Sequence, residues 1–242
     1  DMTDQDAKQQ PSITQDNSLV EACYTMTLNE KRLLMLGMSR VNPMDFPRES
    51  KALRFTLKAS DWTNNFKDEN PYRAMKRAAD SLLVRYVTLH PKTGVTQKIS
   101  WFDSVEYHDD KSSVTVEFSR SIQVRLSGML EQFTQLDLLS VSQLRSIYSV
   151  RLYELLTQFI NSKDYREWRT RVINLDDFRW SMDAVKSYPK IYELKRRILT
   201  PALRELNRRS DLEVRCEDVK SGRTITGFRF HFREQDQREL FS

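Results

Sequence analysis

The spacing of apolar and polar residues divides the first half of the chain into helices and strands. Apolar residues recur at helical spacing over 28–38, and Thr27 opens that segment with a capping-box signature. Residues 53–57 alternate apolar and polar side chains, which predicts a strand followed by a short helix. Asn70 and Pro71 predict the N-cap and the first residue of a longer helix. Two hairpins complete this half, with turns at PKTG (91–94) and DDKSS (109–113).

The second half repeats this order of elements. The pattern predicts a helix from Val141 to Phe159, a strand and a short helix within 170–180, a long helix over 189–209 and a hairpin over 211–232. The short helix opens at Asp176 or Asp177, and the hairpin turns at residues 220–222. An offset of 120 residues superposes the two long helices, pairing Tyr72 with Tyr192, Lys76 with Arg196, Arg77 with Arg197 and Leu83 with Leu203.

A short helix, a turn, a longer basic helix and a hairpin form the winged helix-turn-helix arrangement. We therefore predict an α+β fold made of two tandem winged-helix domains related by internal duplication. The predicted boundaries are a mobile N-terminal tail over 1–18, an N-terminal winged-helix domain over 19–130, a linker over 131–140, a C-terminal winged-helix domain over 141–234 and a tail over 235–242.

The long basic helix of the second half separates its side chains into an apolar face and a basic face. An ordinary solvated face mixes the two signs of charge at i,i+4 spacing, whereas the arginines here face mainly one another. Arginine suits bidentate contact with guanine or phosphate, so we predict a double-stranded DNA interface rather than a solvated face. The predicted DNA-binding residues are Arg196, Arg197, Thr200, Arg204, Asn207 and Arg208, with Arg73, Lys76 and Arg77 as their counterparts in the first half.

Pro201 lies inside this helix, where a proline removes one hydrogen bond and costs about 3 kcal/mol. Either the helix bends at Pro201, or it breaks and restarts with Thr200 as its cap. A single bent helix is the favoured prediction.

Composition adds a basic excess to this picture. The 242 residues include 39 Lys and Arg against 34 Asp and Glu, a net charge of +5 that suits a polyanionic partner. Cys23 and Cys216 stand far apart and without ligands at metal spacing, so the sequence predicts no disulfide, metal or other cofactor. No run of about eighteen apolar residues occurs, and a membrane span is not expected. The expected compartment is a reducing cytosol.

Residues for enzyme chemistry are missing from the sequence pattern. His90, His108 and His231 each stand alone, whereas rolling-circle nicking enzymes hold a metal with a pair of histidines. No phosphate-binding GxxxxGK[ST] run is present. We expect no catalytic residues and a protein that is not an enzyme.

Four segments carry a resemblance to a known family. They are NSLVEACYTMTLNEKRLLMLGMSRVNP (17–43), FTQL (133–136), SVRLYELLTQF (149–159) and LKRRILTPALRELNRRSDLEV (194–214). Their order and spacing resemble those of the iteron-binding replication initiator proteins of theta-replicating plasmids, the RepB/RepE-like initiators. The similarity extends from about Asn17 to Glu234.

This resemblance implies a protein that binds directly repeated origin sites, the iterons, as a monomer in the bacterial cytosol. It also implies a homodimer that binds an inverted repeat and represses its own promoter, and hence a role in plasmid copy control. In such a protein the C-terminal domain makes the tighter base contacts, and the N-terminal domain makes weaker DNA contacts and the dimer interface. The host replication initiator and the replicative helicase are implied partners.

Two other functions remain open from the residues alone. A tandem winged-helix transcriptional regulator would bind an operator without a role in replication, and an interaction module would carry its basic face incidentally. Tandem direct repeats of about twenty base pairs beside the coding sequence favour the initiator, since each winged-helix pair covers about two helical turns. A lone inverted repeat favours the regulator.

Overall fold

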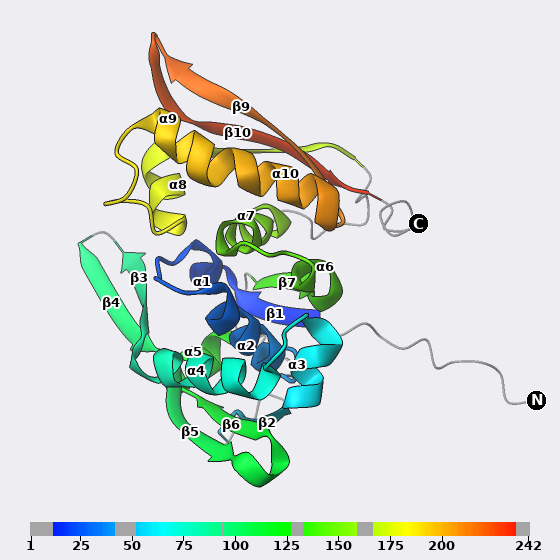
Figure 1. Ribbon diagram of the computed structural model, residues 1–242. Coiled ribbons are helices and arrows are strands. Elements are labelled where there is room, and N and C mark those ends of the chain that lie inside the picture. The colour runs from blue at the N-terminus through cyan, green and yellow to red at the C-terminus, as the bar shows by residue number, and fades with distance from the viewer. Residues whose placement is uncertain (1–11, 42–51, 93, 127–132, 159–166, 236–242) are drawn as a thin grey trace, which may run out of the picture.

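The chain folds into two α+β halves stacked one on the other (Figure 1). The computed structural model describes residues 12–41, 52–92, 94–126, 133–158 and 167–235. The elements up to residue 126 are β1 (Ser12–Asp16), α1 (Asn17–Glu21), α2 (Leu28–Met38), β2 (Arg54–Lys58), α3 (Ala59–Asn65), α4 (Pro71–Val84), β3 (Tyr86–Lys92), β4 (Val95–Ser100), β5 (Phe102–His108), the 3-10 turn η2 (Asp109–Lys111), β6 (Ser113–Phe118) and α5 (Arg120–Leu126). The later elements are β7 (Phe133–Asp137), α6 (Leu138–Ser142), α7 (Ile147–Thr157), β8 (Arg169–Asn174), α8 (Leu175–Ser181), α9 (Ile191–Leu194), the π-helical turn η3 (Lys195–Leu199), α10 (Thr200–Arg209), β9 (Leu212–Ser221) and β10 (Thr224–Glu234).

The two halves share one topology. The order α2, β2, α3, α4, β5, β6 in the first half corresponds to α7, β8, α8, α9–α10, β9, β10 in the second. The strands pair antiparallel in the orders β2-β6-β5 and β8-β10-β9, so the first strand lies beside the last in each sheet. The matching helices agree in length, with 11 residues in both α2 and α7 and 7 in both α3 and α8. This agreement confirms two tandem winged-helix domains, and the β3–β4 hairpin is an addition to the first.

Local sequence signals explain where most helices begin. The Thr27 hydroxyl accepts from the Glu30 backbone N–H, and the Glu30 carboxylate accepts from the Thr27 N–H, which confirms the capping box of α2. Pro71 is the first residue of α4, although the Asn70 side chain makes no capping bond. For α8 the predicted start at Asp176 or Asp177 was late, because Asn174 is the N-cap and accepts from the Asp177 N–H.

The predicted tail and linker are wrong for the residues that form β1 and β7. These two strands pair along their whole lengths, from Ser12 opposite Asp137 to Asp16 opposite Phe133. Ile13 and Leu136 are buried, and buried polar groups find distant partners, as the Thr134 hydroxyl does when it donates to Asn17. The polar composition of the β1 segment predicted mobility, because its partner strand β7 lies over a hundred residues away in the sequence. Residues 1–11 and 131–132 lie outside the described residues.

The predicted helix from Val141 to Phe159 is two helices. α6 ends at Ser142, and α7 begins after Ser146, whose hydroxyl accepts from the Tyr148 N–H. Phe159 lies outside the described residues. Nearly every residue of α7 is buried, because this helix contacts α1 and β7 as well as α10. α7 is therefore the element that joins the two halves.

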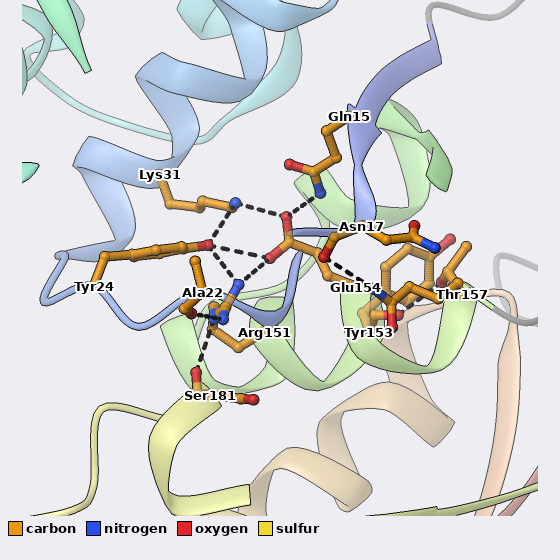
Figure 2. Close-up of polar contacts among 11 residues, drawn as sticks. Gln15, Asn17, Ala22, Tyr24, Lys31, Arg151, Tyr153, Glu154, Thr157 and Ser181 are labelled. Carbon is orange, nitrogen blue, oxygen red and sulfur yellow. Dashed lines mark hydrogen bonds and ion pairs between the residues drawn. The ribbon is translucent and has the colours of Figure 1, made fainter. Parts of the chain in front are cut away.

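A buried ionic network ties α7 to the first half of the chain (Figure 2). Glu154 of α7 is 1% exposed and lies 2.6 Å from the Lys31 ammonium through Oε1 and 3.1 Å from the Arg151 guanidinium through Oε2. Both cations also donate to the Tyr24 hydroxyl, at 3.0 Å from Lys31 and 2.6 Å from Arg151. Gln15 of β1 donates to Glu154 at 2.9 Å. Each buried charge thus has a partner of opposite sign and further hydrogen bonds.

The same network extends into the second winged-helix domain. Arg151 Nε donates to the Ser181 carbonyl at the end of α8, and Arg151 Nη2 donates to the Ala22 carbonyl. Burial alone would raise the pKa of Glu154, but the Lys31 and Arg151 cations outweigh burial and hold that pKa below its ordinary value. Glu154 is therefore ionised in the folded protein, and Arg151 links segments of both halves to it.

We expect Glu154→Gln to lower the free energy of unfolding by about 3–5 kcal/mol, because it leaves two buried cations without a counter-charge. Urea denaturation at neutral pH measures this loss. Glu217→Gln is the matched control, since Glu217 forms an exposed pair with Arg229 at 3.9 Å and its loss costs less than about 1 kcal/mol. Equal, small effects of the two substitutions would contradict this view of the network.

Glu234 at the end of β10 also makes the stability of the fold depend on pH, but its pKa is raised whereas that of Glu154 is lowered. Burial, with the nearby Asp211 carboxylate, raises the pKa of Glu234 from an ordinary 4.5 to about 6. The folded protein thus holds this proton more tightly than the unfolded chain, so stability falls as pH rises from about 4.5 to about 6. We expect Glu234→Gln to flatten this region and to add roughly 1 kcal/mol near pH 7.5, allowing for partial exposure. Thermal melts across this range test the effect, and an unchanged profile would contradict it.

Candidate nucleic-acid interface

The long basic helix of the second domain is continuous from Ile191 to Arg209. α9 passes through the π-helical turn η3 into α10 without leaving helical backbone angles, and the Thr200 N–H donates to the Lys195 carbonyl. The wider turn lies directly before Pro201, which occupies the first turn of α10 and has no N–H to donate. The prediction of one helix is therefore confirmed as to its continuity, with a π-helical turn before the proline, and the bend at Pro201 stays a prediction.

One face of this helix is buried and the other is open. The buried face consists of Leu194, Ile198, Leu199, Ala202 and Leu206. The exposed face presents five of the six predicted residues of this helix, namely Arg196, Arg197, Thr200, Arg204 and Arg208. Within the described part of the chain, Arg197, Arg204 and Arg208 form no ion pair with a carboxylate. Arg196 lies over the ring of Tyr192 at 5.4 Å, and Tyr192 is 65% exposed.

The side chain of Asn207, the sixth predicted residue, makes its hydrogen bonds within the domain. Its side-chain amide donates to the carbonyls of Leu203 and Val214, each at 2.9 Å. Its carbonyl accepts from the Val214 N–H at 2.8 Å. These bonds fasten α10 to the start of β9, so Asn207 has no spare donor pair for reading adenine.

Further basic residues surround the exposed face, and the sequence reasoning missed them. Lys186 and Lys190 are exposed in the turn before α9, and Lys220 and Arg223 are exposed at the tip of the β9–β10 hairpin. That tip turns at Gly222, whose φ of +61° favours glycine. The clustering of lysine and arginine in the two turns that flank a basic helix was the signal available in the sequence. Helix and hairpin are joined by the ion pair from Lys195 to Asp218, at 2.8 Å.

The corresponding helix of the first domain, α4, has a different electrostatic setting. Arg73 and Arg77 are exposed as predicted, but they line a groove together with Glu30, Asp68 and Glu69. Lys76 is half-buried and its ammonium lies 3.0 Å from the Asp109 carboxylate, in the turn between β5 and β6. The basic residues of α4 therefore have acidic neighbours, whereas Arg197, Arg204 and Arg208 of the second helix are exposed and form no ion pair among the described residues.

The described residues offer little for other chemistry. They contain no group of three or more His, Cys, Asp and Glu side chains arranged to hold a metal ion. Cys23 and Cys216 are unpaired thiols, and burial raises the pKa of both, to about 11 and about 12. A thiol with so high a pKa is a poor nucleophile at neutral pH. None of the helices in the described segments combines the length and apolar character needed to cross a membrane.

Comparison with known proteins finds relatives along most of the chain. Two proteins of Escherichia coli are similar to it. A replication initiation protein is 24% identical over 201 residues, which are 82% of this chain and 62% of that protein. An uncharacterised 27.6 kDa protein is 26% identical over 224 residues, 88% of this chain and 92% of that protein. The chain thus spans about 62% of the length of the first relative.

Solved structures show the same fold. The crystal structure of the Pi initiator protein in complex with iteron DNA matches with a TM-score of 0.80 at 18% identity, over 95% of this chain and all of that one. Domains 2 and 3 of RctB match with a TM-score of 0.51 at 10% identity, over 95% of this chain and 94% of that one.

Two family models match the chain in succession. The model for the first winged-helix domain of initiator replication proteins (WH1) covers residues 12–157, and the model for the second (WH2) covers 174–232. The first model includes α7, which by topology is the leading helix of the second domain, and the boundary predicted at residue 141 remains a prediction. The matches together cover more than half of the sequence, and the chain belongs to the family of initiator replication proteins.

Proposed function

We propose that this chain is a plasmid replication initiator that binds directly repeated duplex sites and inserts its α9–α10 helix into the major groove. The observation that carries the proposal is the exposed arginine face of this helix, whose members have no carboxylate partners among the described residues. The α9–α10 helix has the right width for this role, since the major groove of DNA admits one α-helix.

Electrostatics support a polyanionic partner for this face. Arg196, Arg197, Arg204 and Arg208 repel one another in the free protein, and Lys190, Lys220 and Arg223 add to the same field. DNA phosphates relieve this repulsion, and their neutralisation releases counterions from the duplex. Arginine side chains at the centre of the helix can then donate in pairs to guanine. The hairpin tip supplies contacts to the backbone, which fix the register without reading sequence.

The comparisons support replication initiation in particular. The similar Pi initiator was crystallised with iteron DNA, and a similar E. coli protein is a replication initiation protein. We propose that the chain acts in the bacterial cytosol by DNA binding, without enzyme chemistry of its own. Dimerisation, autorepression and recruitment of a host initiator and helicase stay predictions that rest on the family resemblance.

The two domains make unequal contributions in this proposal. α9–α10 is preceded by Lys186 and Lys190, whereas α4 is preceded by Asp68 and Glu69. The same contrast exists at the hairpin that follows each helix, as shown by Arg223 in the second domain and Asp109 in the first. The C-terminal domain therefore supplies most of the affinity, and Arg73 and Arg77 of α4 make weaker contacts.

We expect Arg197→Ala and Arg204→Ala each to weaken binding to the cognate site by about 1–3 kcal/mol, because each removes a base contact or a phosphate contact. The probe is a duplex of about 30 base pairs, three helical turns, that the full chain selects from a randomised library. Titrations at several salt concentrations separate the two kinds of contact, since loss of a phosphate contact lowers the salt slope by about 1.

Arg215→Ala is the matched control for both variants. Arg215 is exposed, but it lies on the other face of the β9–β10 sheet, over the ring of Trp168 at 4.4 Å and paired with Glu213 at 2.9 Å. Arg215→Ala removes the same positive charge as Arg197→Ala or Arg204→Ala and leaves the proposed interface intact. A loss of binding in Arg215→Ala equal to that in the other two variants, or no selection of any sequence by the wild-type chain, would overturn the proposed function.

A further inference from the structure

Asp109 in the η2 turn between β5 and β6 joins two residues of α4. Its Oδ1 accepts from the Tyr72 hydroxyl at 2.7 Å and from the Lys76 ammonium at 3.0 Å. Lys76 also lies over the rings of Tyr72 and Tyr107, at 5.5 and 5.0 Å from their centroids. We call Tyr72, Lys76 and Asp109 the Asp109 cluster. It draws the central lysine of α4 toward the hairpin and away from the solvent in front of the helix.

The duplicated helix of the second domain has the same pair of side chains without the acid. Tyr192 and Arg196 correspond to Tyr72 and Lys76, and the Arg196 guanidinium lies 5.4 Å from the Tyr192 ring, much as Lys76 does from Tyr72. No carboxylate among the described residues pairs with Arg196. The turn of the second hairpin carries Arg223 in place of an acid. The tyrosine and the basic residue are thus common to both helices, but only Lys76 of the first has a paired carboxylate among the described residues. The hairpin acid of the second domain, Asp218, pairs with Lys195 and leaves Arg196 unpaired.

The energetics allow Asp109 to compete with DNA rather than to exclude it. Its carboxylate is 75% exposed, and an exposed ion pair contributes at most about 1 kcal/mol. Hydrogen bonds from Tyr72 and Lys76 lower the pKa of Asp109 below its ordinary value, so the carboxylate is ionised at neutral pH. A DNA phosphate that approaches α4 must displace it from Lys76 and tolerate its negative charge nearby.

We propose that Asp109 limits the affinity of the N-terminal domain for DNA by holding Lys76 in the Asp109 cluster. This inference rests on the proposed function and assigns one residue to the inequality between the two domains. Among the described residues, Asp109 is the carboxylate that pairs with Lys76. Asp110 in the same turn acts on Tyr72 through its charge, Asp80 accepts from Tyr107, and Asp68 and Glu69 line the groove beside Arg73 and Arg77. Release of Lys76 adds one phosphate contact to an interface that already includes the C-terminal domain.

The test compares Asp109→Asn with wild type in the full chain, on the selected duplex and on a scrambled duplex. We expect Asp109→Asn to bind both duplexes about 3- to 10-fold more tightly, with a salt slope steeper by about 0.9, the value for one added phosphate contact. Asp103→Asn is the matched control, because Asp103 is exposed at the other end of β5 and its replacement changes the net charge equally. Circular dichroism melts check that each variant is folded.

Lys76 supplies the second arm of the test. In the Lys76→Met background, Asp109→Asn is expected to bring no gain, so that the double variant binds both duplexes no more tightly than Lys76→Met alone. A gain that persists without Lys76, or an Asp109→Asn variant that behaves like Asp103→Asn, would overturn the role of Asp109. These outcomes differ from a failure of the proposed function, in which the wild-type chain selects no sequence. A wild-type chain that binds neither duplex overturns both.

Discussion

The fold depends on one buried carboxylate between two cations. Glu154 of α7 neutralises Lys31 from the first half and Arg151 from its own helix, and Arg151 continues to the end of α8. Buried charges of this kind stabilise a structure little when compared with apolar packing, but removal of one partner is costly. The network therefore selects one arrangement of α7 against its neighbours more than it adds stability. Since α7 contacts both halves, it sets how the two winged-helix domains are presented together.

Internal duplication provides two helices in the same framework, and their surroundings have diverged in charge. Around α9–α10 the preceding turn and the hairpin tip are basic, whereas around α4 both carry acids. The buried faces differ much less, because each helix packs apolar residues against its sheet. Packing thus maintains the common fold, and exposed charge distinguishes the two domains. The proposed strong and weak DNA-binding domains on one chain follow from this division.

Much of the fold could be predicted from periodicity, since amphipathic helices and hairpins with glycine turns have local signals. The capping box at Thr27, the hairpin turn at Gly222 and the exposed arginines of α10 are of this kind. The β1–β7 pair was missed because a short polar strand becomes stable only when distant residues cover it. The bonds that Asn207 makes within the domain were missed for a related reason, as helical periodicity gives the direction of a side chain but not the backbone of β9 that it bonds. The pairing of Lys76 with Asp109 was likewise invisible without the hairpin.

The structure of the full chain bound to its selected duplex tests the central claim, that the exposed face of α9–α10 reads DNA. The account predicts this helix in the major groove, with Arg197 and Arg204 facing the bases and the Gly222 hairpin tip along the backbone. α4 is predicted to lie nearer to the phosphates and to make fewer contacts. A duplex bound on the Arg215 face of the β9–β10 sheet, or held by α4 alone, would contradict the account.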